Sequence, residues 1–158
     1  MISRFLILHK YKIVGIVLLI LGIISAYLRF YLGIKPSYLN LPVFAFYSSF
    51  LDTKTFQVIT NNISEEIVSL ILLLGLLLIN FSKEVVENDK VNSIRLFSFV
   101  SSVLLNSVIL IFSVLFIYGF AFVNVLMFNI FSQMIIYQII FRILFIKNQK
   151  ALSTDGII

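Results

Sequence analysis

Four long apolar segments constrain the fold of this chain more than any other feature. They span about residues 13–32, 64–84, 97–117 and 122–145. An α-helix rises about 1.5 Å per residue, so about 20 apolar residues are enough to cross the hydrocarbon core of a bilayer. Only 12% of the residues are charged and 61% are hydrophobic, whereas a soluble domain carries about 25% charged residues. We therefore expect an all-α membrane protein forming a single integral membrane domain over residues 1–158, with four transmembrane helices arranged as two hairpins.

The densest charged run, from Ser82 to Leu96, lies between the second and third apolar segments and separates the two predicted hairpins. The net charge of +5 could indicate nucleic-acid binding, but the basic residues gather at the ends of apolar segments, which is typical of membrane orientation. Most of them fall on one side of a four-helix arrangement, namely Arg4, Lys10, Lys12, Lys83, Lys90, Arg95, Arg142, Lys147 and Lys150. Arg29, Lys35 and Lys54 fall on the other side. The positive-inside rule predicts a multi-pass membrane protein with both termini cytoplasmic. Because the basic residues are explained by orientation, we expect no nucleic-acid partner.

The first apolar segment follows a basic start and so resembles a signal peptide. No small-residue cleavage site follows Ala26, and the segment is long enough to span, so we expect an uncleaved helix. At helical spacing, small residues and one arginine fall on a single face: Gly15, Gly22, Ala26, Arg29 and Gly33. This smooth face predicts close contact with another helix and would turn Arg29 inward. The alternative is that glycine is simply common in membrane helices.

Residues 34–63 form the largest segment that does not read as a helix. Pro36 and Pro42 oppose a helix at its start. Aromatic residues then crowd together, which is unusual for a solvated loop: Phe44, Phe46, Tyr47 and Phe50. We expect an aromatic outer interfacial segment between the first two helices. Its structure, whether strand, short helix or re-entrant segment, is left open because short apolar runs are ambiguous.

A candidate outer ion pair involves Arg29 with Glu65 or Glu66. Arg29 lies near the outer end of the first helix, and the two glutamates lie near the outer end of the second, so their depths are similar. An ionisable group at such a depth is a functional hypothesis by default. The alternative is that Arg29 extends to the interface while Glu65 reaches back to Asn62 in a capping box.

The third and fourth helices carry polar side chains that could line a path for a solute. Ser98, Ser102, Asn106 and Ser113 share one face of the third helix. The fourth contains Asn124, Asn129, Ser132, Gln133, Gln138 and Arg142. The alternative is that these groups form hydrogen bonds between helices, worth about 0.6 kcal/mol each. Tyr118-Gly119 predicts a tight outer turn between the two helices.

The central charged stretch supplies the second candidate site. Glu84 and Glu87 would project from the membrane at helical spacing if the second helix continued from Ser82 to Glu87, and Asp89 follows two residues later. One hypothesis is that these three carboxylates dock a basic cytoplasmic partner. The other is that they pair internally with Lys90, Arg95 and Arg142 and hold the two hairpins together.

Enzymatic chemistry finds little support in the composition. The chain has no Cys and a single His, His9, which excludes a disulfide, a thiolate metal site and a bis-His haem within one chain. A serine nucleophile would also need a base, and His9 lies in the basic start of the chain. We expect no catalytic residue, no cofactor-binding residue and no metal site.

One motif of the central stretch resembles a pattern in a group of small uncharacterised bacterial membrane proteins with four spans. It reads Phe81-Ser82-Lys83-Glu84, then Glu87 and Asp89, then Ile94-Arg95-Leu96 and Ser98. The segments 42–49 and 61–66 look similar too. The resemblance implies four spans and carries no known activity. Asn88 departs from it, because a carboxylate is expected there, and this weakens the argument for an acidic docking patch.

These observations, together with the resemblance, predict a non-enzymatic accessory or regulatory protein of the bacterial inner membrane. Its expected partners are the lipid bilayer, a protein on the cytoplasmic side and further copies of the chain. A small oligomeric transporter or channel is the alternative, and a membrane enzyme is the third possibility.

Overall fold

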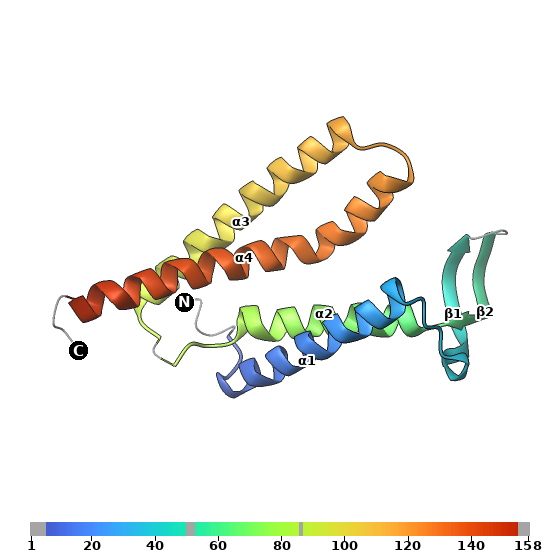
Figure 1. Cartoon of the computed structure of the whole chain (residues 1–158), viewed down its shortest axis with the longest axis horizontal. Helices are drawn as coiled ribbons and strands as arrows, with labels where there is room; N and C mark the ends of the chain where they lie inside the picture. Colours follow the sequence, from blue (N-terminus) through green and yellow to red (C-terminus); the bar gives the residue numbers. More distant parts are fainter. Residues whose placement is uncertain (1–5, 50–52, 86, 155–158) are drawn as a thin grey trace. The chain divides into compact units, whose positions relative to one another are not determined.

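A computed structural model describes residues 6–49, 53–85 and 87–154 (Figure 1). The chain is mostly helical, and four helices are long and apolar enough to cross a membrane. They are α1 (Lys10–Ala26), extended by a π-helical turn at Tyr27–Tyr31, α2 (Ser64–Phe81), α3 (Asp89–Phe116) and α4 (Phe120–Thr154). The chain divides into two compact units, residues 17–75 on the one hand and residues 1–16 with 76–158 on the other. Each unit is described by itself.

In the unit of residues 17–75, α1 and α2 approach closely at Gly22. A Cβ atom at this position would lie 2.7 Å from Cδ2 of Leu72, so only a glycine fits without a shift. Arg29 is buried on the same face of α1. The small-residue face expected from the sequence therefore forms a close helix contact at Gly22 and turns Arg29 inward.

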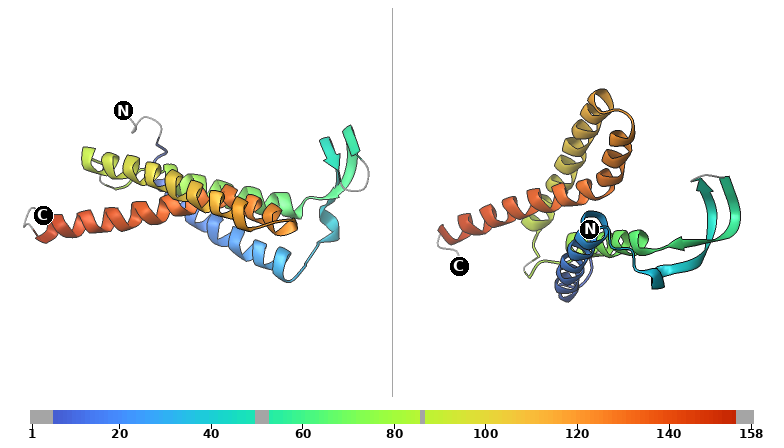
Figure 2. Two further views of the ribbon diagram at one scale, coloured as in Figure 1. Left: turned by 90° about the horizontal axis from the view of Figure 1, so that it is seen from above. Right: turned by 45° about the vertical axis from the view of Figure 1, so that its right-hand side comes forward.

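Residues 34–63 contain a two-stranded antiparallel sheet, which adds strands to the expected all-α fold. A 3-10 turn at Ser37–Leu39 leads into β1 (Asn40–Ser49), which pairs with β2 (Thr53–Asn62), as Figure 2 shows. The register places Phe44 opposite Val58. Because side chains alternate along a strand, Phe44 and Phe46 share a face, and both are exposed. The rings of Phe46 and Phe56 meet edge to face at 5.7 Å.

In the other unit, α3 and α4 pack against each other and are joined by a short turn. Gly119 lies in this turn with a φ of +69°, a conformation that glycine adopts without strain. The buried apolar core consists of Val91 from α3 with Tyr137, Phe141 and Phe145 from α4. The core therefore lies near the start of α3 and in the second half of α4.

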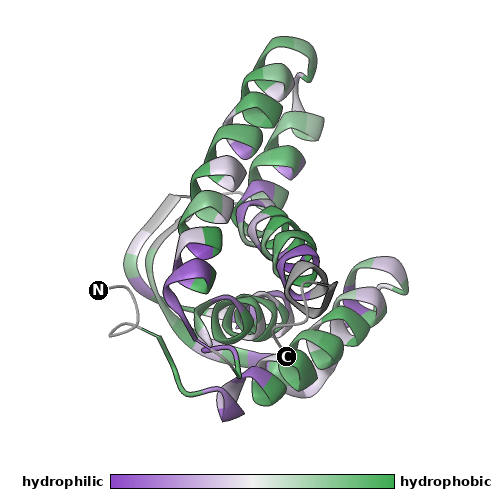
Figure 3. Ribbon diagram, turned by 90° about the vertical axis from the view of Figure 1, so that its left-hand side faces the viewer, coloured by the Kyte–Doolittle hydropathy of each residue, from purple (hydrophilic) through white to green (hydrophobic). Residues whose placement is uncertain are grey.

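The polar face of α3 is buried, and its apolar faces are exposed. Ser98, Ser102, Asn106 and Ser113 are buried, whereas Leu104 and Val108 are exposed. Figure 3 shows that apolar residues make up most of the length of the helices. A helix that buries its serines and exposes its leucines has the pattern expected in lipid, where an exposed polar group finds no partner.

The ends of three helices differ from the sequence prediction. The second helix ends at Phe81. The sequence prediction ended it at residue 84, and the hypothesis of projecting glutamates required it to continue to Glu87. The hydroxyl of Ser82 donates to the carbonyl of Leu78, and the amide of Lys83 donates to the carbonyl of Ile7 at 2.9 Å. These bonds divert the backbone from the helix.

The third and fourth helices are longer than predicted. Helix α3 begins at Asp89 because the side chain of Asn88 accepts a hydrogen bond from the amide of Val91 at 2.8 Å and caps it. The first two turns of α3 thus belong to the charged stretch. Helix α4 continues past residue 145 to Thr154, where the sequence predicted a polar tail.

Candidate functional site

A short backbone bridge brings the start of the chain to the end of α2. The amide of Ile7 donates to the carbonyl of Phe81 at 2.8 Å, and the carbonyl of Ile7 accepts from the amide of Lys83. His9 adds a contact between its Nδ1 and the carbonyl of Lys83 at 2.8 Å. The bridge places the first turn of α1, which carries Lys12, next to the segment that carries Glu84.

Glu84 is buried and contacts two cations. Nζ of Lys12 donates to its Oε1 at 2.5 Å, and Nη1 of Arg142 lies 3.8 Å from the same oxygen. The side chains of Lys12 and Glu84 are only 6% and 7% exposed, while that of Arg142 is 38% exposed. Glu84 therefore links the start of α1 to α4.

Glu87 and Arg95 form a second ion pair beside the first. Nη2 of Arg95 donates to Oε1 of Glu87 at 2.7 Å, and this oxygen also accepts from the amide of Glu84 at 2.8 Å. Nη1 of Arg95 reaches the carbonyls of Asn80 and Ser82, each at 3.4 Å. Its guanidinium also lies 5.1 Å from the ring centroid of Phe141. Arg95 thus ties the connection between α2 and α3 to both α3 and α4.

The Glu84 cluster comprises Lys12, Glu84, Glu87, Arg95 and Arg142. Three of its members are cationic and two are anionic, so its formal charge is +1. Removing such groups from water is costly, and each is stable here because it faces an opposite charge. The cluster therefore holds the N-terminal segment, the connection after α2, and α3 and α4 together, with one positive charge in excess.

The structure brings together four of the five residues predicted for this site. Glu84, Glu87, Arg95 and Arg142 belong to the cluster, whereas Asp89 is exposed in the first turn of α3. Lys12 was not predicted to belong to this site. The sequence indicated it only as one of the basic residues that set the orientation, and its partner Glu84 lies 72 residues away in the sequence.

The outer pair forms in the unit of residues 17–75. Arg29 makes an ion pair with Glu65, and its Nε donates to the hydroxyl of Ser64 at 2.9 Å. Glu66 instead accepts from the side-chain amide of Asn61 at 3.0 Å. The capping-box alternative does not describe Glu65, because its carboxylate faces Arg29. The side-chain oxygen of Asn62 accepts from the amide of Ser64 at 3.3 Å.

The polar residues of α3 and α4 bond to one another. Asn106 and Asn129 exchange hydrogen bonds between their side-chain amides at 3.3 and 3.4 Å. The hydroxyl of Ser132 donates to Asn106 at 2.6 Å, and the amide of Gln133 donates to Ser102 at 3.0 Å. These side chains therefore satisfy each other between the two helices.

Comparison with known proteins adds no family: no family model, curated protein or solved structure matches this chain. Within the described residues, no group of three or more His, Cys, Asp or Glu side chains could hold a metal ion. We therefore infer function from the geometry of the Glu84 cluster, from the hydrogen bonds between α3 and α4, and from the exposed surfaces.

Proposed function

We propose that this chain is a non-enzymatic accessory or regulatory protein of the bacterial inner membrane. Its four helices form two hairpins that cross the bilayer, with both termini and the Glu84 cluster on the cytoplasmic side. The observation that carries the proposal is that Ser102 and Asn106, which are buried on α3, bond to polar side chains of α4: Asn129, Ser132 and Gln133. Because these polar side chains already bond to one another, we expect the protein to act through contacts on its surface.

Two features support the proposed orientation and the aromatic outer segment. Nine of the twelve basic residues fall on the proposed cytoplasmic side, in agreement with the positive-inside rule. The exposed face of the β1–β2 sheet carries Phe44, Phe46, Phe56 and Val58. Aromatic residues favour the headgroup region of a bilayer, so this face suits the outer interface.

Reporter fusions test the topology directly. A reporter that is active only outside the cytoplasm should give a signal when it is fused after Lys54 and none when it is fused after Lys90. A reporter that is active only in the cytoplasm should give the opposite result. An outside signal at Lys90 would contradict the orientation. The result does not depend on whether the protein has a partner.

The internal contacts of Glu84 and Glu87 bear on the docking hypothesis. Glu84 already faces Lys12 and Arg142, and Glu87 already faces Arg95. A basic partner would have to replace these internal contacts. This favours internal pairing over docking for both glutamates and leaves Asp89, exposed at the start of α3, as the carboxylate open to a partner.

A crosslinked pull-down from membranes tests the accessory role. We expect a protein partner recovered in fixed proportion to the tagged chain. A variant with Glu84, Glu87 and Asp89 changed to their amides should melt at a lower temperature and retain this partner. A stable variant that loses the partner, most readily at high salt, would instead support docking by the carboxylates.

The second candidate is a small oligomeric transporter or channel, and a membrane enzyme ranks third. The row formed by Ser102, Asn106, Asn129 and Gln133 favours a transport role, because similar polar rows can line a path. Liposomes containing the purified chain should show no solute flux above empty liposomes if the accessory proposal holds. Flux that is abolished by Asn106→Leu would favour the transporter.

A further inference from the structure

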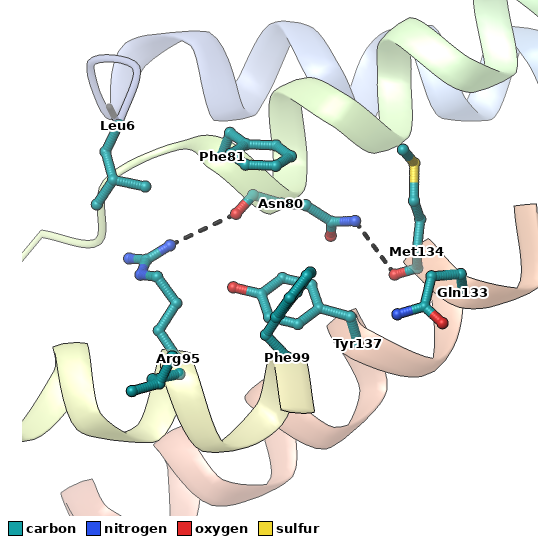
Figure 4. A pocket seen from close by; sticks show the side chains of 9 residues that line it. Leu6, Asn80, Phe81, Arg95, Phe99, Gln133, Met134 and Tyr137 are labelled. Atoms are coloured by element: carbon teal, nitrogen blue, oxygen red, sulfur yellow. Dashed lines mark hydrogen bonds between the residues drawn. The ribbon is translucent and has the colours of Figure 1, made fainter. Parts of the chain in front are cut away.

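A pocket of about 290 Å³ lies in the unit that contains α3 and α4, and Figure 4 shows side chains that line it. Four segments of the chain contribute to the pocket: the N-terminal segment before α1, the last turn of α2, the start of α3 and the middle of α4. Its surface is almost entirely apolar. The apolar and aromatic side chains of the lining are Leu6, Phe81, Leu96, Phe99, Met134 and Tyr137.

The polar residues at the pocket are already bonded elsewhere. Nε2 of Gln133 donates to the hydroxyl of Ser102 at 3.0 Å, and Nδ2 of Asn80 donates to the carbonyl of Met134 at 3.1 Å, as drawn in Figure 4. The charge of Arg95 is balanced within the Glu84 cluster. Oδ1 of Asn80 and Nε of Arg95 have no hydrogen-bond partner among the described residues, but both atoms are buried. The pocket therefore offers a ligand neither a charge nor a hydrogen bond.

The apolar surface and the volume together indicate what fills the pocket. An empty pocket is unfavourable, because the lining atoms lose their dispersion contacts on one side. Water needs two to four polar partners, which this surface does not provide. An apolar cavity of about 150 Å³ binds benzene, which has six carbon atoms, so a pocket of about 290 Å³ has room for roughly twelve. A segment of hydrocarbon chain fits this description.

The surroundings of the pocket indicate where such a chain comes from. Phe81, Leu96 and Phe99 line the pocket and are also exposed on the surface of the helices. Phe99 lies in the third predicted span, and Met134 lies in the fourth. In the proposed membrane placement, these exposed side chains contact the acyl chains of the bilayer. A lipid chain can thus enter the pocket without passing through water.

We propose that this pocket holds one acyl chain of a membrane lipid and that the lipid headgroup is not recognised. The bound chain contacts the N-terminal segment through Leu6, the end of α2 through Phe81, and both α3 and α4. It therefore adds an apolar contact between the same segments that the Glu84 cluster joins by charge. The inference rests on the proposed membrane placement and is independent of any protein partner.

Photo-crosslinking of the full chain in liposomes tests the proposal. The probe is a phosphatidylcholine with a photoreactive diazirine on one acyl chain, and mass spectrometry of peptides locates the label. Leu104 and Val108 are exposed on α3 outside the pocket lining, so any surrounding lipid can label them. Tyr137 is only 8% exposed and lines the pocket, so we expect a chain in the pocket to label it as well.

The pattern of labels separates this inference from the membrane placement on which it rests. Label at Leu104 and Val108 without label at Tyr137 would overturn the lipid site and leave the membrane placement intact. Absence of label at all three residues would contradict both. Label at Tyr137 as well as at Leu104 and Val108 is the expected result.

Two matched variants test whether the label reaches Tyr137 through this pocket. Leu96→Trp adds bulk to the pocket lining, whereas Leu104→Trp places the same side chain outside it. Leu96→Trp should lose the label at Tyr137 but keep the label at Val108, which also shows that the variant is inserted. Leu104→Trp should keep both labels. Equal labelling of Tyr137 in the two variants would overturn the proposal, and the wild-type pattern remains decisive if Leu96→Trp does not fold.

A second lipid tests the independence from the headgroup. Phosphatidylglycerol carries the same photoreactive chain on an anionic headgroup. The ratio of label at Tyr137 to label at Val108 should be the same for phosphatidylglycerol and phosphatidylcholine, because the pocket surface has no polar group to distinguish them. A higher ratio for either lipid would show that the headgroup is recognised and would contradict the proposal.

Discussion

Two ion pairs of this chain use similar residues in different surroundings. Each joins a buried cation to a glutamate next to one end of α2. Lys12 of α1 pairs with Glu84 after the last residue of α2, and Arg29 of the π-helical turn pairs with Glu65 in the first turn of α2. The side chains of Lys12 and Glu84 are 6% and 7% exposed. Arg29 is also buried, but Glu65 is 53% exposed. Both side chains of the Lys12–Glu84 pair are therefore shielded from water, whereas in the Arg29–Glu65 pair only Arg29 is shielded.

This difference determines what the loss of a partner costs. Removing one charge from a buried pair leaves the other charge without water or a counter-charge. A partly exposed glutamate regains water when its partner is lost, so the same substitution costs little. The number of ion pairs in this chain therefore says less about stability than the burial of each partner does.

The largest expected effect is that of Glu84→Gln. The change leaves Lys12 buried without a full counter-charge and should lower the free energy of unfolding by about 3–5 kcal/mol. Denaturation in detergent measures the effect. Asp89→Asn is the control, since Asp89 is exposed, and it should change stability by less than about 1 kcal/mol. Equal effects of the two variants would contradict the burial argument.

A smaller loss is expected for Glu87→Gln. Arg95 would lose its charged partner but keep the carbonyls of Asn80 and Ser82 and the ring of Phe141. The cost should be about 1.5–3 kcal/mol, the range of a hydrogen bond to a charged group. In the same denaturation experiment, the free energy of unfolding of this variant should lie between those of Glu84→Gln and the wild type. A loss as large as that of Glu84→Gln would mean that the carbonyl contacts of Arg95 contribute nothing.

The outer pair should give a smaller effect still. Glu65→Gln should cost about 0.2–1 kcal/mol, because Glu65 is half exposed and Ser64 still contacts Arg29. Arg29→Leu and Glu65→Leu should each lower the melting temperature, and their combination should cost less than the sum. Strict additivity would show that the two side chains do not interact. Glu66→Leu serves as a comparison, since Glu66 contacts Asn61 instead.

The polar row between α3 and α4 should show the smallest effect. Ser102→Ala removes the acceptor of the Gln133 amide and should cost about 0.6 kcal/mol, the average of a hydrogen bond between membrane helices. Ser107→Ala is the matched control, because Ser107 is exposed on the same helix. A cost above that of Glu87→Gln would mean that polar contacts, rather than the charge cluster, dominate the stability of this unit.

The sequence predicted those features that depend on local periodicity. Apolar runs of sufficient length predicted four helices, and helical spacing predicted that Ser98, Ser102, Asn106 and Ser113 share a buried face. The same spacing predicted that Arg29 points inward, and Arg29 is buried. In each case the signal lies within a few helical turns, so it can be read from one segment alone.

Features that depend on distant backbone contacts were missed. The sequence prediction extended α2 beyond Phe81, because no local signal marks the β-bridge between Ile7 and Ser82 at which the helix ends. Lys12 was overlooked for the same reason, since its partner is 72 residues away. The strands β1 and β2 were not assigned from the sequence, because short apolar runs fit strands and helices alike. Asn88, noted only as a departure from a pattern, is the N-cap of α3.

The buried carboxylate of Glu84 is paired with Lys12 inside the chain. The double-mutant cycle of Lys12→Met and Glu84→Gln, followed as the free energy of unfolding in detergent, measures the strength of this pair. Each single variant should be destabilised, and the double variant should cost less than the sum by about 0.5–3 kcal/mol, because the second change no longer strands a charge. Additive effects, or a Glu84→Gln variant as stable as the wild type, would contradict the account.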